Sequence, residues 1–296
     1  MPKNICYLNG KFLDVEKARI SPLDRGFLFG EGLFETWRTY RGRPYGLPEH
    51  LKRLQGSAKR IGIPFDPSED WEARCITLAR RNGMLERDGA VRMTVTRGHG
   101  PVSLIVTETV DPTTLMLFRP LEPGLADAKR GGVAIHPVSV GSGVSERQRQ
   151  IKSLNYLPAI LARTEARKHR CFEALYHLDN GKVLEGTTSN VFIVKRGVVR
   201  TSPISAGLLP GVTRQKTLRL ARQLAKVREE LFTLDDVAAA DEVFLTASSI
   251  EVVPVVKLGR QKIGNGKPGE LTLAIQRRYR EHVARAVGLR LDELGD

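Results

Sequence analysis

Val183-Leu184-Glu185-Gly186-Thr187-Thr188-Ser189-Asn190-Val191-Phe192 is one of four segments of this chain that could carry chemistry. Gly186 and the hydroxyl residues after it predict a tight turn between two apolar runs, rich in backbone donors. An ordinary hairpin turn has this composition. The alternative is a binding turn in which Glu185 is held as a fixed carboxylate. Both interpretations stay open on this segment alone, so the rest of the sequence must separate them.

Three further segments could carry chemistry. Lys152 lies just ahead of an apolar helix in Ile151-Lys152-Ser153-Leu154-Asn155-Tyr156-Leu157. It is either a solvated surface lysine or a desolvated neutral amine that attacks a carbonyl. Leu208-Leu209-Pro210-Gly211-Val212-Thr213-Arg214 is a glycine turn that leads into a helix, where Thr213 is an N-cap or part of a phosphate site. Phe244-Leu245-Thr246-Ala247-Ser248-Ser249 ends a strand in hydroxyl residues, as a simple cap or as a second anion-binding turn.

Composition limits the class of protein. A chain of 296 residues reaches the length at which single hydrophobic cores stop growing, which predicts two domains. The net charge is +14, but the basic residues are spread along the chain, and no aromatic stacking motif accompanies them, so we expect no nucleic-acid partner. The N-terminus lacks the apolar region of a signal peptide, and no apolar run could cross a membrane. Cys6, Cys75 and Cys171 fit neither a disulfide framework nor a metal site, so we expect a soluble, cytoplasmic protein with no metal.

The hydrophobic pattern mixes helices and strands. Leu47, Leu51, Leu54, Ala58 and Ile61 form a helical stripe, whereas residues 91–96 alternate apolar and polar side chains as strands do. The predicted helices are 47–61, 70–81, 157–170, 213–225 and 270–287. The predicted strands are 91–96, 104–109, 114–118, 133–137, 174–177, 191–194 and 242–246. This pattern favours an α/β or α+β fold with a domain of residues 1–118, a linker at 119–130 and a domain of residues 131–296.

In their order along the chain these segments resemble the fold type IV pyridoxal-phosphate enzymes. That group includes branched-chain aminotransferases, D-amino acid aminotransferases and aminodeoxychorismate lyases. The similarity covers nearly the whole chain. It extends from Tyr7-Leu8-Asn9-Gly10 and residues 24–36, through His50-Leu51-Lys52-Arg53-Leu54 and the segments above, to Glu251-Val252-Val253-Pro254-Val255. It implies a smaller N-terminal α/β domain, a larger C-terminal α/β domain with a β-barrel-like sheet, a homodimer and transaminase activity.

The resemblance gives roles to the ambiguous residues. Lys152 would bind pyridoxal 5′-phosphate as a Schiff base and move a proton between substrate and cofactor. Glu185 would pair with the pyridine nitrogen of the cofactor and keep it protonated. Tyr156 would donate a hydrogen bond to the phenolic oxygen, and Arg53 would bind the phosphate unless it is a surface arginine. The other cofactor-binding residues implied in this way are Thr188, Ser189, Asn190, Gly211, Val212, Thr213 and Thr246.

The substrate side follows the family patterns less closely. Arg92 aligns with an arginine of the branched-chain enzymes, although their usual Tyr-x-Arg-Pro is Ala90-Val91-Arg92-Met93 here. Arg97 belongs to a Thr-Arg-Gly pattern of the other subgroups. Arg38 is either a carboxylate-binding residue or a charge on a strand surface. The substrate-binding residues implied by the resemblance are Phe34, Arg38, Arg92, Arg97, Ala247 and Ser248.

One departure separates the subgroups. The D-amino acid enzymes place an Arg-x-His clamp where this chain has Val102-Ser103-Leu104, and the uncharged stretch counts against D-amino acid and lyase activities. The main hypothesis is therefore transfer of an amino group between a branched-chain or other aliphatic L-amino acid and 2-oxoglutarate. D-amino acid transaminase, R-amine transaminase and aminodeoxychorismate lyase are alternatives on the same fold. A non-enzymatic protein that binds an acidic partner such as RNA would instead associate in a salt-sensitive way and be indifferent to Lys152→Ala.

Overall fold

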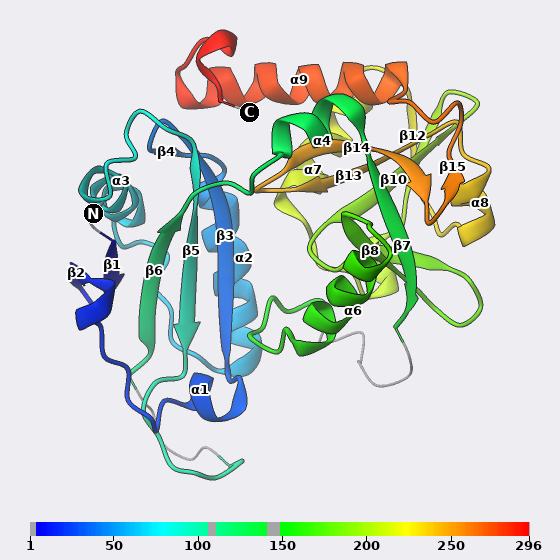
Figure 1. The fold of residues 1–296 in the computed structure, drawn as a ribbon. Coiled ribbons are helices and arrows are strands. Elements are labelled where there is room, and N and C mark those ends of the chain that lie inside the picture. The colour runs from blue at the N-terminus through cyan, green and yellow to red at the C-terminus, as the bar shows by residue number, and fades with distance from the viewer. Residues whose placement is uncertain (1–3, 106–110, 141–148, 296) are drawn as a thin grey trace. The chain divides into compact units, whose positions relative to one another are not determined.

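The computed structural model describes residues 4–105, 111–140 and 149–295. The chain forms two compact units, drawn in Figure 1. Unit 1 consists of Met1–Leu121, Ile151–Asn155 and Ala284–Asp296, and unit 2 consists of Glu122–Gln150 and Tyr156–Val283. Two stretches from later in the chain therefore belong to the unit that the N-terminal residues build, and one of them contains Lys152.

Unit 1 is built on a six-stranded antiparallel sheet with the strand order β2-β1-β6-β5-β3-β4. Its strands are β1 (Ile5–Leu8), β2 (Lys11–Asp14), β3 (Gly32–Tyr40), β4 (Arg43–Pro44), β5 (Gly89–Thr96) and β6 (Thr113–Arg119). Its helices are α1 (Arg25–Phe29), α2 (Leu47–Ile61) and α3 (Trp71–Arg81), with short 3-10 turns η1 (Val15–Lys17) and η3 (Leu291–Glu293).

One face of this sheet forms the core of unit 1. Leu33 and Trp37 of β3, with Val91 of β5, belong to a buried cluster that also contains the apolar stripe of α2 and residues of α3. Because successive strand residues point to opposite faces, Phe34 and Arg92 lie on the other face of the sheet. The alternation predicted for residues 91–96 is confirmed, and it places Arg92 on the face opposite to this cluster.

The two core helices begin and end as the sequence predicts. Pro48 stands in the first turn of α2, where its missing N–H costs nothing, and the helix ends at Gly62 with a φ of 67°. The side chain of Asp70 caps α3 by accepting a hydrogen bond from the Ala73 N–H. The helices predicted over 47–61 and 70–81 are confirmed.

Unit 2 is built on a nine-stranded mixed sheet with the order β12-β11-β10-β13-β14-β7-β8-β9, and β15 pairs with β14. Its strands are β7 (Val133–Ser139), β8 (Glu173–His177), β9 (Val183–Gly186), β10 (Asn190–Lys195), β11 (Val198–Thr201), β12 (Lys226–Glu229), β13 (Glu242–Ala247), β14 (Glu251–Leu258) and β15 (Gln261–Lys262). Its helices are α4 (Leu125–Gly131), α6 (Leu157–Lys168), α7 (Val212–Ala221), α8 (Leu234–Ala238) and most of α9 (Glu270–Val287), with the 3-10 turn η2 (Ile204–Ala206).

Most elements of unit 2 agree with the sequence pattern. The strands predicted over 133–137, 174–177, 191–194 and 242–246 are confirmed as β7, β8, β10 and β13, and α6 and α9 confirm two helices. The helix predicted over 213–225 is shorter, because α7 ends at Ala221 and residues 222–224 form turns. The two units together have the mixed α/β fold class that the sequence predicts.

Two predicted segments have other outcomes. Most of the strand predicted over 104–109 lies outside the described residues, and its first two residues, Leu104 and Ile105, are not in a strand. The predicted linker at 119–130 contains the end of β6 and most of α4. Its role as an interdomain linker, with the domain limits on either side, stays a prediction.

Candidate active site

Lys152 lies in an extended segment along β3 in unit 1. The backbone N–H of Phe34 donates to the Lys152 carbonyl at 2.9 Å, and the Leu154 N–H donates to the Gly32 carbonyl at 3.0 Å. These bonds fix Lys152 on the sheet edge, immediately before the chain enters α6. Its Nζ lies 4.4 Å from the centroid of the Phe34 ring, and the residue is half-buried. The amine is therefore held against an aromatic face rather than extended into solvent.

Arg53 belongs to a buried charged triad close to this lysine. Its Nε and Nη2 donate to the two oxygens of the Glu35 carboxylate at 2.7 and 2.6 Å. His50 Nδ1 lies 2.7 Å from Glu35 Oε2. Burial would raise the pKa of Glu35, but the charges and hydrogen bonds of Arg53 and His50 lower it to about 2. Burial lowers the pKa of His50, and the positive charges of Arg53 and Lys152 lower it further against the opposing effect of Glu35.

Glu35 and His50 were given no role by the sequence analysis. Both lie in segments that carry the family resemblance, residues 24–36 and 50–54. Their place in these segments is the sequence signal that could have identified them as site residues. The sequence does not show that the Glu35 carboxylate pairs with His50 and Arg53, because Glu35 is on β3 and the other two residues are on α2. The triad orients Arg53 while leaving its side chain 11% exposed.

The three arginines considered for the substrate have different surroundings. Arg92 lies on the same sheet face as Phe34, with its Cζ 3.6 Å from the centroid of that ring. Arg38 is almost wholly buried, and its Nη2 donates to Asp88 Oδ2 at 2.8 Å. Of the two, Arg92 therefore shares the Phe34 surface with Lys152, whereas Arg38 is enclosed in an ion pair.

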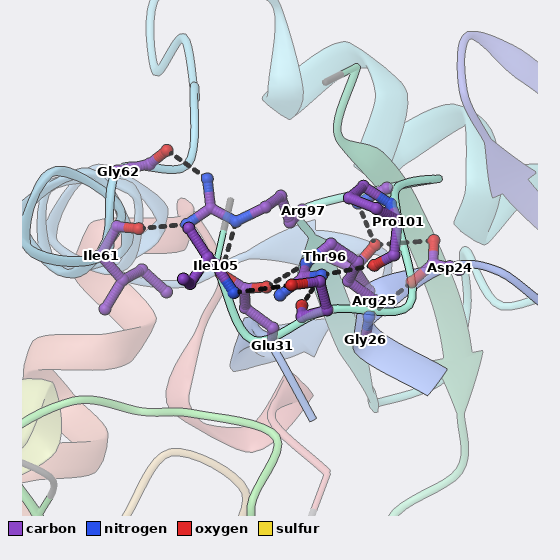
Figure 2. Close-up of polar contacts among 12 residues, drawn as sticks. Asp24, Arg25, Gly26, Glu31, Ile61, Gly62, Thr96, Arg97, Pro101 and Ile105 are labelled. Carbon is purple, nitrogen blue, oxygen red and sulfur yellow. Dashed lines mark hydrogen bonds and ion pairs between the residues drawn. The ribbon is translucent and has the colours of Figure 1, made fainter. Parts of the chain in front are cut away.

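Arg97 takes part in a polar network at the end of β5, which Figure 2 shows. Its Nε donates to Glu31, and its Nη1 and Nη2 donate to the carbonyls of Gly62 and Ile61, where α2 ends. Arg25 donates to the other oxygen of Glu31. Burial would raise the pKa of Glu31, but hydrogen bonds from Arg25 and Arg97 hold it below its usual value. These three side-chain hydrogen bonds of Arg97 therefore connect the end of β5 to the loop of Glu31 and to the end of α2.

Unit 2 fixes the carboxylate of Glu185 at the end of β9. The Asn190 side-chain amide donates to its Oε2 at 3.0 Å, and the Leu209 backbone N–H donates to its Oε1 at 3.3 Å. A Cβ on Gly211 would stand 2.1 Å from Asn190 Oδ1, so a glycine is required for Asn190 to keep this position.

Burial, with the nearby Glu173, Tyr156 and Glu185, raises the pKa of Tyr176 to about 12. Tyr156, which begins α6, is thus within electrostatic range of the same tyrosine as Glu185.

The hydroxyl groups of the turn after β9 have a different partner. Thr188 and Ser189 donate to Oε2 of the buried Glu173 at 2.9 and 3.2 Å, and Thr187 donates to its Oε1. The Gly186 N–H also donates to the Ser189 carbonyl at 2.7 Å. Of the two interpretations of this turn, the structure supports a fixed Glu185, while the side chains of Thr188 and Ser189 serve to lock the turn.

The N-terminus of α7 and the end of β13 form a polar group in unit 2. Thr213 Oγ1 lies 3.5 Å from Ser248 Oγ, and Thr213 and Thr246 are 3% and 1% exposed. Within the described part of the chain, Thr246 Oγ1 is buried without a hydrogen-bond partner. Gly211 is the N-cap and Val212 the first residue of α7, so no capping side chain competes for the first N–H groups of the helix. An orphaned hydroxyl beside an uncapped helix N-terminus fits the oxygens of a phosphate.

The predicted residues thus form two groups, one in each unit. Unit 1 contains Phe34, Arg53, Arg92 and Lys152, close to Glu35 and His50. Unit 2 contains Tyr156, Glu185, Asn190, Gly211, Val212, Thr213, Thr246, Ala247 and Ser248. Arg38 and Arg97 are each bound in an ion pair elsewhere in unit 1.

Comparison with known proteins identifies the family. A model of the amino-transferase class IV family matches residues 32–258. A putative branched-chain-amino-acid aminotransferase of Methanocaldococcus jannaschii is 38% identical, over 93% of this chain and 95% of its own. A D-alanine aminotransferase of Bacillus licheniformis is 34% identical, over 90% of this chain and 93% of its own.

Comparison with solved structures points to the same family. The branched-chain aminotransferase of Thermoproteus uzoniensis with norvaline has a TM-score of 0.86 at 28% identity, with 96% of each chain covered. That of Thermobaculum terrenum in its PLP-form has a TM-score of 0.83 at 26% identity, covering 97% of this chain and 96% of the other.

The two-sheet α/β fold is therefore that of the branched-chain aminotransferase structures. The chain belongs to the class IV aminotransferases, and it is an enzyme that transfers amino groups with pyridoxal 5′-phosphate as its cofactor. Among the residues that the structure describes, every helix is too short or too polar to cross a membrane.

Proposed function

We propose that this enzyme binds pyridoxal 5′-phosphate through Lys152 and Glu185 and exchanges an amino group between an amino acid and a 2-oxo acid. The observation that carries the proposal is Glu185, whose carboxylate is oriented by N–H donors from Asn190 and Leu209. When bound, the cofactor supplies an electron sink for the substrate carbon that loses its proton, and a carboxylate at the pyridine nitrogen strengthens that sink. Structures of a related branched-chain aminotransferase with pyridoxamine 5′-phosphate and with N-(5′-phosphopyridoxyl)-L-glutamate support the same cofactor.

In this proposal each residue of the site has its own role. Lys152 would hold the cofactor covalently, and its Nζ would hold and move the proton of the substrate carbon. Tyr156 donates to the phenolic oxygen of the cofactor. Arg53 and the cluster of Thr213 and Thr246 bind the phosphate, with the first N–H groups of α7. In this assignment the Glu35–His50 pair positions Arg53 and does not touch the cofactor.

For the substrate we propose an aliphatic, branched-chain L-amino acid with 2-oxoglutarate as acceptor. The named branched-chain relatives support it, as does Arg92, whose guanidinium lies on the Phe34 ring close to where Lys152 stands. A charge there suits the carboxylate of an amino acid. We leave Arg38 and Arg97 out of the substrate site because their ion pairs with Asp88 and Glu31 occupy them.

A second substrate class has support of its own. Several curated relatives are D-alanine aminotransferases, at 30% to 34% identity. D-amino acids are therefore the alternative, against which the uncharged Val102-Ser103-Leu104 stretch argues. R-amine transaminase and aminodeoxychorismate lyase remain the further alternatives of the same fold.

The test combines spectroscopy with a substrate screen. Purified protein loaded with cofactor should show a visible absorption band that borohydride reduction removes, and Lys152→Ala should lose it. Lys59→Ala, a matched change of an exposed lysine on α2, should keep the band. L-leucine, D-alanine, 1-phenylethylamine and aminodeoxychorismate are then each tested for bleaching of the band. Bleaching by D-alanine but not L-leucine would overturn the substrate proposal, and a colourless protein would overturn the proposed cofactor site.

We further infer that the enzyme acts as a homodimer in the cytoplasm. In unit 1, Phe27 and Leu104 are 77% and 84% exposed, and in unit 2 the α6 residues Leu157 and Leu161 are 64% and 61% exposed. Large apolar side chains this exposed are typical of a surface that another chain covers. Light scattering should give twice the chain mass of 32.9 kDa, and a monomeric mass would contradict the inference. The three cysteines are free and buried, which suits a reducing compartment.

A further inference from the structure

Three metal-ligating side chains meet on the surface of unit 2, apart from every residue assigned above. His136 is on β7, Glu165 is on α6 and His169 is the residue at the C-terminal end of α6. One ligand atom from each lies within 4.8 Å of the others. The rings of His136 and His169 are stacked with centroids 4.1 Å apart, and His169 Nε2 lies 3.2 Å from Glu165 Oε1. We call these three residues the His–Glu–His cluster.

Local packing creates the cluster. Glu165 and His169 are four residues apart, which places them on one face of the helix. Ala162 and Ala166 are buried against β7 and β8, and such small side chains let the helix approach the sheet closely. That approach brings the end of α6 to His136, which pairs with Ala174 of β8 in the parallel register. The sequence alone gives no metal motif, because His136 comes from a different element far from the other two.

The side chains supply the donor atoms that a transition metal prefers. His136 and His169 each offer an imidazole nitrogen. Lys168 donates to Glu165 Oε2 at 3.0 Å, whereas Glu165 Oε1 lies next to His169. Two imidazoles with one carboxylate form a donor set that favours Zn²⁺ and neighbouring transition metals over Mg²⁺ or Ca²⁺.

The distances are near those of a metal site. Zinc–nitrogen bonds of about 2.1 Å in a tetrahedron place ligand atoms about 3.4 Å apart. Ligand atoms within 4.8 Å of one another must close by at most about 1.4 Å. The imidazole lone pairs lie in the ring planes, so the stacked rings must also tilt toward each other. The His169 side chain is 52% exposed and has room for that rotation.

We propose that His136, Glu165 and His169 bind a divalent late first-row transition metal, with Zn²⁺ as the probe. Three protein ligands leave the remaining position to water. The ion links the C-terminal end of α6 to β7 and so holds the helix on the sheet. This site takes no part in the amino-transfer chemistry, and it stands whether or not the substrate proposal does.

The experiment is zinc titration of the cofactor-loaded enzyme after removal of adventitious metal with a chelator. Calorimetry should give one Zn²⁺ per chain and no binding of Mg²⁺ at the same concentrations. His136→Ala, His169→Ala and Glu165→Gln should each weaken zinc binding by at least about tenfold, because loss of even an outer-shell partner costs that much. His99→Ala removes a histidine of unit 1 that lies outside the cluster and should leave the affinity unchanged. Co²⁺ should give the visible absorption of a low-symmetry site in the native enzyme and lose it in His169→Ala.

The variants at the exposed positions Glu165 and His169 keep the test decisive even if His136→Ala fails to fold. Far-ultraviolet circular dichroism and the cofactor absorption band show whether each variant is folded and loaded. Zinc binding that is abolished by the cluster variants and retained by His99→Ala supports the proposal. Absence of saturable zinc binding, or affinity that the cluster variants leave unchanged, overturns it.

Discussion

Replacing Glu35 by glutamine tests the buried triad that orients Arg53. Glu35 is fully buried, and its carboxylate accepts hydrogen bonds from Arg53 Nε and Nη2 at 2.7 and 2.6 Å. Glutamine keeps the volume of the side chain but removes its charge, and one of its two terminal atoms becomes a donor that faces the arginine. Arg53 then remains largely buried without its anion, and a buried charge that loses its partner is strongly destabilising.

The pKa of Glu35 sets the magnitude. Its fall from 4.5 to about 2 in the folded protein corresponds to about 3 kcal/mol of stability at pH 7, at 1.36 kcal/mol for each tenfold change. Because the folded-state pKa is lowered, this stability is complete above pH 4.5 and is lost as the pH falls toward 2. At pH 4 about 1 kcal/mol of it should already be gone. The pKa of His50 is also lowered, so acid destabilises the folded state through this residue as well, beginning at about pH 6.5.

Urea unfolding followed by tryptophan fluorescence measures the effect in the right part of the molecule. The chain has two tryptophans, Trp37 and Trp71, and both are buried in unit 1. At pH 7, Glu35→Gln should lower the free energy of unfolding by about 3 kcal/mol, and the difference from the native chain should narrow at pH 4. Glu281→Gln, which removes an exposed partner of Arg278 on α9, should change it by less than about 1 kcal/mol.

Two results would refute this reasoning. One is a cost below about 1 kcal/mol at pH 7, which is the range of a surface pair. The other is a cost that is the same at pH 4 and pH 7, because then the charge of Glu35 would not be its source. Bound cofactor adds a further comparison: if Arg53 binds the phosphate, the cost of the substitution should be smaller in the loaded enzyme than in the unloaded one.

Three other substitutions test the two groups of site residues, and a fourth, at Arg97, serves as a control. Gly211→Ala places a methyl group on Asn190 Oδ1, so the cofactor should bind about tenfold or more weakly, measured by equilibrium dialysis. Glu185→Gln should retain the cofactor but lower kcat by about 10²-fold or more, and a kcat within about threefold of the native value would count against its pairing with the pyridine nitrogen. Arg92→Gln should raise KM for the amino acid by about 10- to 100-fold in steady-state kinetics, whereas Arg97→Gln should lower Tm and leave KM unchanged.

The sequence predicted those helices and strands whose period and ends depend on neighbouring residues in the chain. The stripe of α2 and the alternation of β5 set their own periods, and capping residues set their ends. In contrast, no strand was predicted over Glu251–Leu258, which contains Pro254, a residue that is unusual within a sheet because it has no N–H to donate. In the structure Pro254 pairs with Phe244 of β13, and pairing of β14 with β7 begins at Val255 and Val133. This pairing is a property of the assembled sheet.

The candidate site shows the same limit of sequence analysis. The types of residue in the site were predictable, but the residues with which they pair were not. In the sequence, Arg38, Arg92 and Arg97 are all candidates for binding a substrate carboxylate. The structure shows ion pairs for Arg38 and Arg97, whose partners lie 50 and 66 residues away in the sequence. Because an arginine bound to a buried or half-buried carboxylate would have to break that pair to bind a substrate, each such pair removes one candidate. Arg92 has different surroundings, because its guanidinium lies on the Phe34 ring, which Lys152 Nζ also contacts, and this proximity to Lys152 is a contact that only the folded chain creates.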